Sequence, residues 1–275
     1  MGIKSKTLPV IIESAPALAK YLGVGEVTLV RDDLLESVGG KKYRSLLHVT
    51  KEIPAGKPIH VFSYQGSHTA FTLSALLPNH TIILYGKSYP GGAYRDFMTR
   101  LLSRQSNVIQ YTGSLWAMMA KYLVAKLQNR DDRFMNLGGA LGKDQAYITA
   151  AKEVFKELGN SAYHIVPVAS GDLLNALRTT FHRVTGILTQ PWYLRIIQRL
   201  RLKSTKGIVS RSYSEREKLV YDIYHRTGFA FDPVFMGSTL DYCRRKGTNG
   251  DHICLWVTCP NLATDFILSL DSSDH

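Results

Sequence analysis

Residues 39–46 read Gly-Gly-Lys-Lys-Tyr-Arg-Ser-Leu and follow an apolar run, Val-Thr-Leu-Val-Arg, at residues 27–31. The run is typical of a buried strand, and the two glycines permit a tight turn before a helix-like stretch that begins at Lys42. A strand, a glycine turn and a helix in this order form the start of an α/β unit. The stretch therefore predicts that Lys42 stands at a strand-to-helix junction.

The rest of the chain continues this alternation. Further apolar runs, which we expect to form strands, occupy residues 59–63, 81–85, 107–111, 163–168 and 253–258. Helix-like stretches occupy residues 42–51, 69–77, 93–103, 114–128, 144–158 and, after a turn at 169–172, continue to about residue 183. Alternation of this kind predicts parallel sheets covered by helices.

Loops that leave the carboxyl ends of parallel strands line the ligand crevice of open α/β sheets. Four such loops carry the polar residues and glycines of interest, at residues 39–42, 65–69, 169–173 and 258–261. We therefore expect these four loops to converge on one site.

Composition limits the class of protein and its partners. Hydrophobic residues make up 45% and charged residues 20%, as in an ordinary globular protein. The chain has 34 basic and 22 acidic residues, a net charge of +12 that favours anionic partners: a phosphorylated cofactor, a carboxylate substrate, nucleic acid or an acidic membrane surface. No run is apolar enough to cross a bilayer or to act as a signal peptide, so a cytoplasmic location is expected.

The cysteines set one more limit. They are Cys243, Cys254 and Cys259. Three cysteines at irregular spacing cannot form a disulfide framework or a closed zinc site, so we expect a reducing compartment and no metal centre.

Residues 30–34, Val-Arg-Asp-Asp-Leu, together with residues 39–46, resemble the opening of the aminocyclopropanecarboxylate (ACC) deaminase / D-cysteine desulfhydrase family. That family has a Gly-Gly-Asn-Lys-x-Arg-x-Leu segment whose lysine binds pyridoxal 5'-phosphate (PLP) covalently. The resemblance puts Lys41 in the place of the asparagine and Lys42 in the place of the lysine. A neutral amine is needed to attack the cofactor aldehyde. Without the resemblance, the pair would be read as surface lysines at a helix start.

Residues 65–69, Gln-Gly-Ser-His-Thr, are similar to the family's Gln-Ser-Asn-Gln/His segment. The resemblance implies that Ser67 takes the place of the asparagine that hydrogen-bonds the cofactor's phenolic oxygen, and that His68 moves a proton during catalysis. Gly66 stands where the family has a catalytic serine, and it has no hydroxyl. A histidine after a strand also serves often as a structural hydrogen-bonding group, which is the alternative for His68.

Residues 166–173, Val-Pro-Val-Ala-Ser-Gly-Asp-Leu, resemble the turn with which the family binds the PLP phosphate. The resemblance implies that Ser170 and Gly171 hold the phosphate with backbone N–H groups at a helix N-terminus. Asp172 would place a carboxylate beside that phosphate if it pointed inward. The alternative is that Asp172 turns outward and caps the helix.

Two later blocks complete the resemblance. Residues 227–238 contain the family's Asp-Pro-Val frame, but Phe235 and Met236 replace its Tyr-Glu pair and supply neither a base nor a carboxylate. Thr258 is retained from the family's Thr-Gly-Gly loop, which implies a place near the ring nitrogen. Cys259-Pro260 replaces the two glycines with bulkier and stiffer residues.

The resemblance implies the fold of the type II PLP enzymes: two open, twisted, mainly parallel sheets flanked by helices, with the cofactor cleft between two lobes. We expect a larger lobe from residues 1–48 and 140–275 and a smaller lobe from residues 49–139. The implied activity is that of a PLP-dependent lyase or deaminase on a small amino acid, with β-elimination preferred over ring opening, in a homodimer. The alternative is a catalytically degenerate homologue with a binding or regulatory role.

Residues 191–206 hold five basic residues and no acidic one. We expect a helix that packs on the sheet and exposes a solvated basic face. Binding to nucleic acid or to a membrane surface through this segment is the alternative. Because no recognisable nucleic-acid module accompanies the charge, nucleic acid is not the expected partner.

Overall fold

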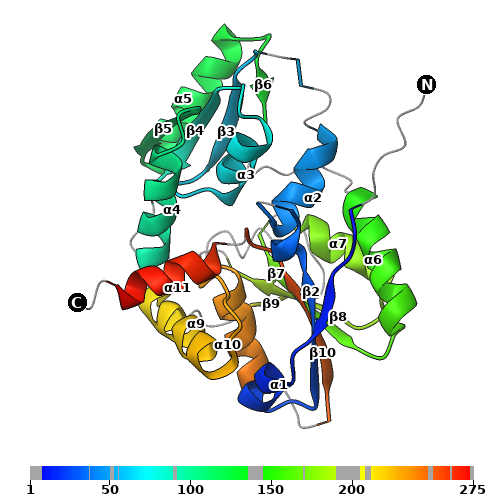
Figure 1. Cartoon of the computed structure of the whole chain (residues 1–275). Coiled ribbons are helices and arrows are strands. Elements are labelled where there is room, and N and C mark those ends of the chain that lie inside the picture. Colours follow the sequence, from blue (N-terminus) through cyan, green and yellow to red (C-terminus); the bar gives the residue numbers. More distant parts are fainter. Residues whose placement is uncertain are drawn as a thin grey trace.

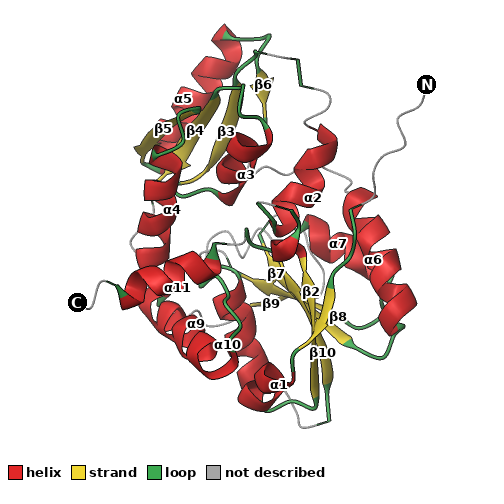
Figure 2. Ribbon diagram, viewed as in Figure 1, coloured by secondary structure: helices red, strands yellow, loops and turns green. Residues whose placement is uncertain are grey.

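The computed structural model describes residues 8–36, 38–49, 53–54, 56–88, 92–135, 145–169, 171–189, 205–207, 212–246, 250–260 and 262–272. Within these residues the chain forms two β-sheets, each flanked by helices (Figure 1). One sheet is mixed and the other is parallel (Figure 2). The expected fold class, two mainly parallel sheets flanked by helices, is confirmed. The expected lobe boundaries stay a prediction.

The larger sheet has six strands in the order β1-β2-β10-β7-β8-β9. These strands are β1 (Ile12–Ser14), β2 (Glu26–Arg31), β7 (Tyr163–Val168), β8 (Val184–Leu188), β9 (Thr205–Gly207) and β10 (His252–Val257). β1 is antiparallel to β2, and all other pairs are parallel. The carboxyl ends of β2, β10, β7 and β8 therefore lie along one edge, where loops that bind ligands are expected.

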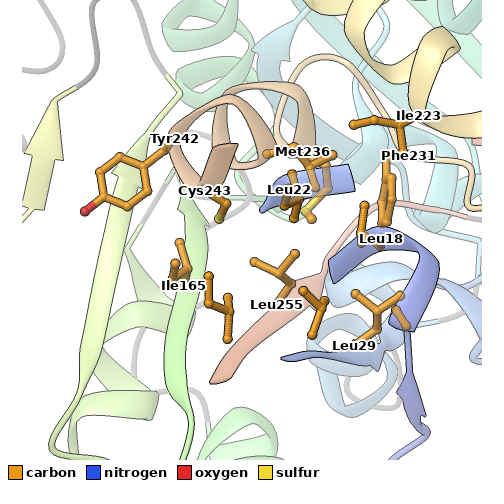
Figure 3. Packing of buried hydrophobic residues seen from close by; sticks show 14 of the residues in the cluster. Leu18, Leu22, Leu29, Ile165, Ile223, Phe231, Met236, Tyr242, Cys243 and Leu255 are labelled. Carbon is orange, nitrogen blue, oxygen red and sulfur yellow. The ribbon is translucent and has the colours of Figure 1, made fainter. Parts of the chain in front are cut away.

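Helices cover both faces of the six-stranded sheet. They are α1 (Pro16–Leu22), α6 (Gln145–Leu158), α7 (Asp172–Arg178), α9 (Tyr213–Thr227) and α10 (Met236–Lys246), whereas α11 (Ala263–Asp271) packs in a separate cluster. Successive residues of β10 point to opposite faces, so Leu255 packs in a cluster with α1, α9 and α10, whereas Trp256 packs in a cluster with α6 and α7. Figure 3 shows the first cluster, in which Leu255 and Leu29 face Leu18 and Met236. Strands buried on both faces are mostly apolar, as β10 is after its first residue, His252.

The smaller sheet has four strands, all parallel, in the order β5-β4-β3-β6. They are β3 (Ile59–Tyr64), β4 (Ile82–Lys87), β5 (Val108–Gly113) and β6 (Arg133–Phe134). The helices that accompany this sheet in the sequence are α3 (His68–Leu76), α4 (Ala93–Ser103) and α5 (Leu115–Gln128). Helix α2 (Gly40–Val49) contacts α3, α6 and the short 3₁₀ helix η1 (Asp32–Leu34), so it lies where the two parts of the molecule meet (Figure 1).

The structure corrects the predicted end of one helix in the second half of the chain. Helix α7 ends at Arg178 rather than near residue 183, because Thr179 and Thr180 form a tight turn onto Ala176 and Leu177. Strand β8, which the sequence analysis did not predict, begins at Val184 and pairs with β7 along its length.

The basic segment is only partly described, because residues 190–204 lie outside the described ranges. Lys206, which we expected in a helix, belongs to strand β9. No described helix is long and apolar enough to cross a membrane.

Candidate functional site

The glycine turn before α2 is packed tightly on both sides. At Gly39, where φ is +63°, a Cβ atom would lie 2.0 Å from the carbonyl oxygen of Asp33. At Gly40, where φ is +83°, a Cβ atom would lie 2.7 Å from the carbonyl carbon of Cys259. Both the left-handed conformation and the missing space require glycine. The turn thus brings the first turn of α2, with Lys42, against the loop after β10.

Arg44 anchors the first turns of α2 through an ion pair and hydrogen bonds. Its Nη2 atom lies 2.8 Å from Oδ1 of Asp32, and both side chains are buried. Its guanidinium also donates to the carbonyl oxygens of Leu8, at 3.2 Å, and Pro9, at 3.0 Å. These additional hydrogen bonds offset part of the desolvation cost of a buried ion pair. Lys42, two residues before Arg44 in the same helix, is partly exposed. The contacts of Arg44 hold the backbone of this helix turn in place.

Ser67 serves as the N-cap of α3. Its Oγ atom accepts a hydrogen bond from the backbone N–H of Ala70 at 3.4 Å, and the residue is 5% exposed. Gly66 has φ of +69°, and a Cβ atom there would lie 3.0 Å from the carbonyl oxygen of Arg95. A serine at this position, as in the family, would be strained by the close approach of α4. The hydroxyl proton of Ser67 is not used in the cap, so it can still be donated.

His68 contacts a buried tyrosine that the sequence analysis did not single out. Its Nε2 atom lies 3.0 Å from the hydroxyl of Tyr94, and its ring lies 5.4 Å from the ring of Phe235. Tyr94 is 1% exposed. Burial raises its pKa well above the ordinary value, and the nearby Asp232 and Cys259 raise it further. Tyr94 therefore stays a neutral phenol at physiological pH.

Asp232 links the block at residues 227–238 to the loop after β10. Its carboxylate accepts hydrogen bonds from the backbone N–H groups of Phe235, at 2.6 Å, and Met236, at 3.2 Å. It also accepts one from the thiol of Cys259. Burial raises the pKa of Asp232, while these hydrogen bonds act in the opposite direction. The sequence marked Asp232 only as part of the Asp-Pro-Val frame, and nothing in it indicated the thiol contact.

Thr258 stands at the carboxyl end of β10, and its side chain is 4% exposed. Among the described residues, its Oγ1 atom has no hydrogen-bond partner. Leaving a buried hydroxyl unsatisfied costs on the order of 1–3 kcal/mol. The next two residues, Cys259 and Pro260, contact Gly40 at the start of α2. A ligand with a hydrogen-bonding group at this position would satisfy the hydroxyl of Thr258.

The third predicted loop is only partly described, because Ser170 lies outside the described residues. Gly171 is buried, has φ of +94°, and is the N-cap of α7 without a side-chain hydrogen bond. Asp172 is the first residue of α7 rather than its cap, and it is partly exposed. β7 and β10 are parallel neighbours, so Gly171 and Thr258 follow strands that end at the same edge of the sheet.

A pocket of about 170 Å³ borders the loop after β10. Its lining residues are Glu13, Arg31, Asp33, Gly228, Phe229, Ala230, Phe231, Asp232, Val257, Cys259, Pro260, Ala263 and Thr264. The guanidinium of Arg31 is held by Asp33, at 2.8 Å, and by Glu13. Lys42, Ser67 and Thr258 do not line this pocket, whereas Asp232, Cys259 and Pro260 do.

No protein-family model and no curated protein matches the sequence of this chain. The crystal structure of an ACC deaminase homologue superposes with a TM-score of 0.67 at 19% identity, over 96% of this chain and 95% of the other. The chain has the fold of the type II PLP enzymes.

Two further solved structures superpose on this chain over most of its length. The processed form of threonine deaminase isoform 2 from Solanum lycopersicum gives a TM-score of 0.61 at 13% identity, over 97% of this chain and 82% of the other. A hydrogen sulfide-producing enzyme from Fusobacterium nucleatum gives a TM-score of 0.61 at 10% identity, over 92% and 95% of the two chains. At these identities the likeness establishes the fold.

The predicted site residues are thus partly assembled. The structure brings the turn before Lys42 together with the loop that follows Thr258, and it places His68 beside Phe235. Among the described residues no cluster of three or more metal-ligating side chains occurs. Sequence reasoning missed Tyr94, because it belongs to an ordinary amphipathic helix and no motif surrounds it.

Proposed function

We propose that this chain is a PLP-dependent lyase or deaminase that acts on a small amino acid, with β-elimination of the D-cysteine desulfhydrase kind preferred over cyclopropane ring opening. The observation that carries the proposal is the buried hydroxyl of Thr258, which lacks a partner among the described residues at the edge where ligands bind in this fold. A ring nitrogen of the cofactor would satisfy it. The left-handed glycines at 39 and 40, which fix the start of α2, agree with this fit.

When bound, PLP supplies an electron sink for the negative charge that develops at the substrate Cα. Lys42 would hold the cofactor and, once released, take up the Cα proton. Thr258 would face the ring nitrogen, and Ser67 would donate its hydroxyl proton to the phenolic oxygen. Ser170 and Gly171 would hold the phosphate with backbone N–H groups.

His68 is suited to moving a proton near the substrate. Its Nε2 atom lies 3.0 Å from the hydroxyl of Tyr94, so the tautomer of the imidazole is coupled to the direction of that hydroxyl. When Nε2 accepts the proton of Tyr94, Nδ1 carries the imidazole N–H. The buried phenol thereby fixes the orientation of the ring.

Two observations favour β-elimination over ring opening. Phe235 packs against His68, and Met236 is fully buried and donates its backbone N–H to Asp232. Neither side chain supplies the base or the carboxylate of the family's Tyr-Glu pair. One protein of the same fold is a hydrogen sulfide-producing enzyme. The proposed net reaction converts D-cysteine and water into pyruvate, ammonia and hydrogen sulfide.

The cofactor assignment is tested by absorbance. Purified protein incubated with PLP should show a band at roughly 410–430 nm, which is typical of a lysine-bound cofactor. Lys42→Ala should lack the band, whereas Lys41→Ala, which changes the neighbouring lysine, should keep it. A colourless wild-type protein, or an equal band in Lys42→Ala, would rule out the assignment.

The activity is tested separately. Sulfide, ammonia and pyruvate released from D-cysteine should appear in equal amounts with wild-type protein and should be lost with Lys42→Ala. Absence of release from D-cysteine and from other small amino acids, together with an intact absorbance band, would favour the alternative, a degenerate homologue that binds the cofactor. The packing of Cys259-Pro260 against Gly40, where the family has two flexible glycines, is the observation that favours this alternative.

A further inference from the structure

One buried carboxylate, that of Asp232, contacts two segments of the candidate site. Asp232 is 1% exposed. Its Oδ1 atom accepts a hydrogen bond from the backbone N–H of Phe235 at 2.6 Å. Its Oδ2 atom accepts one from the backbone N–H of Met236, at 3.2 Å, and one from the thiol of Cys259. Both oxygens thus act as acceptors, as those of an ionised carboxylate do.

The contact with the thiol extends toward Lys42. The backbone of Cys259 packs against Gly40, where a Cβ atom would lie 2.7 Å from the carbonyl carbon of Cys259. Gly40 is the first residue of α2, and Lys42 follows two residues later. Because close-packed atoms leave no free space at this contact, a shift of the loop at Cys259 moves the start of α2.

The contact with the backbone amide extends toward His68. Asp232 holds the backbone of Phe235, and the ring of Phe235 lies 5.4 Å from the ring of His68 at an interplanar angle of 51°. The Nε2 atom of His68 also lies 3.0 Å from the hydroxyl of Tyr94. The imidazole is thus held by an aromatic contact and a hydrogen bond, and Asp232 determines the position of the aromatic partner.

The thiol donor is a departure from the sequence motif. Cys259 stands where the similar Thr-Gly-Gly loop has a glycine. Glycine offers no side-chain donor, whereas the S–H group of Cys259 donates to Asp232. A hydrogen bond to an ionised acceptor is stronger than one between neutral groups. Cys259 therefore adds a link between the loop after β10 and the start of α10.

We propose that Asp232 and Cys259 form a positioning pair, which fixes the two halves of the candidate site relative to each other. One half is the start of α2 with Lys42, and the other is the ring of His68. The pair acts through backbone contacts, so neither member needs to touch a ligand. The catalytic roles of Lys42 and His68 rest on the proposed function, whereas the link between the two halves exists without a cofactor.

The charge of Asp232 makes the positioning pair sensitive to pH. Burial raises the pKa of Asp232, whereas the hydrogen bonds from Cys259 and from the backbone amides lower it. The other titratable or charged groups around this carboxylate are Tyr94 of α4 and, in the pocket that Asp232 lines, Glu13, Arg31 and Asp33. Loss of the thiol donor should therefore let Asp232 take up a proton at a higher pH. A protonated Asp232 accepts its hydrogen bonds less strongly, so the pair is then weakened.

The first test needs no cofactor. NMR of ¹⁵N-labelled protein follows the ring nitrogen signals of His68, which are assigned with His68→Gln. Tyr94→Phe removes the hydrogen bond to the ring and shows how far the signals move when the ring is released. Cys259→Ala should move the same signals, whereas Cys259→Ser, which keeps a donor, should leave them near their wild-type positions. Cys254→Ala is the matched control, because Cys254 is another fully buried cysteine and lies in β10, and it should leave the signals unchanged.

The second test uses the cofactor and pH. Cys259→Ala should raise the dissociation constant for PLP, measured from the absorbance band, about tenfold, as loss of one hydrogen bond to a charged group does. The affinity of each variant should fall as the pH falls, because only the neutral amine of Lys42 binds the aldehyde. In Cys259→Ala this fall should begin at a higher pH, since Asp232 is then protonated at a higher pH, and Cys259→Ser should restore the wild-type profile. A purely structural role would lower the affinity equally at every pH.

Unchanged ring signals of His68 in Cys259→Ala, a serine variant no better than the alanine variant, an unshifted pH profile, or an equal effect of Cys254→Ala would overturn the proposal. Circular dichroism shows whether each variant is folded. If Cys259→Ala does not fold, Asp232→Asn replaces it, because asparagine keeps the shape of the side chain without the charge, and the ring signals of His68 should move. A wild-type protein that lacks the absorbance band would refute the proposed function, whereas the signals of His68 would still decide whether the pair positions the ring.

Discussion

At the scale of single residues, the position of Lys42 depends on the glycine immediately before the lysine pair. Gly40 is needed both for its positive φ and for the space that the loop at Cys259 takes up. Gly23 has a similar φ of +70°, but a Cβ atom there would meet nothing within 4 Å. Substitution of Gly23 therefore measures the energetic cost of the backbone conformation alone, whereas substitution of Gly40 adds the cost of a steric clash.

We expect Gly23→Ala to lower the free energy of unfolding by about 1 kcal/mol, the cost of a left-handed alanine. Gly40→Ala should lower it by about 3 kcal/mol or more, because backbone atoms of Cys259 and Pro260 must move as well. Urea unfolding of both variants measures the difference. Equal losses would show that the close contact is not present in solution.

The sequence indicated that Gly40 and Cys259-Pro260 are each of interest, but it did not indicate that they contact one another. The Gly-Gly-Lys-Lys turn and Cys259-Pro260 both stood out as parts of a motif. Their proximity depends on the parallel pairing of β2 with β10, which no local pattern specifies. Tyr94 was missed for the same reason, because its role comes from contacts with His68 and from the charge of Asp232.

At the scale of elements, local sequence signals predicted some boundaries well. Helix α4 and strand β7 have the predicted ends, since one is a clear amphipathic run and the other a short apolar run. Helix α9 was not predicted, although Ser212 and Glu215 form a capping box that is readable as Ser-x-x-Glu. Strand β8 was missed because its five residues follow a helix that was extended too far.

The start of α10 depends on Asp232. Asp232→Ala would leave the backbone N–H groups of Phe235 and Met236 without this acceptor, and the free energy of unfolding should fall by about 2–4 kcal/mol. Glu153→Ala is the control, because the ion pair of Glu153 with Lys156 is on the surface and should contribute less than about 0.5 kcal/mol. Chemical denaturation of both variants measures the two losses. A change at Asp232 no larger than that at Glu153 would contradict the capping role.

At the scale of the whole molecule, the two sheets are joined through side chains from both parts. Tyr94 and Phe97 of α4 pack against Phe266 of α11, with ring centroids 5.0 and 5.7 Å apart. Glu217 of α9 accepts a hydrogen bond from the backbone N–H of Tyr94 at 3.0 Å. The same helix, α4, thus carries the partner of His68 and connects the two sheets.

The pH dependence of global stability should reflect one buried histidine. His164 lies in β7 with 0% exposure, accepts a hydrogen bond from the indole N–H of Trp256 at 3.3 Å and contacts Phe181. Burial lowers its pKa from 6.5 to about 4. In the unfolded chain the imidazole takes up a proton at a higher pH than in the folded protein. The contribution of the neutral ring to stability is therefore complete above pH 6.5 and is lost as the pH falls toward 4.

The size of this loss follows from the shift, since each pKa unit corresponds to about 1.4 kcal/mol, so about 3 kcal/mol should be lost over this range. His164→Gln removes the titrating group, and its free energy of unfolding should fall less steeply than that of wild-type protein between pH 6.5 and 4. Denaturant titrations at half-unit pH intervals give these slopes. A slope unchanged in His164→Gln would mean that His164 is not held neutral by burial, because only a group with different pKa values in the two states makes stability depend on pH.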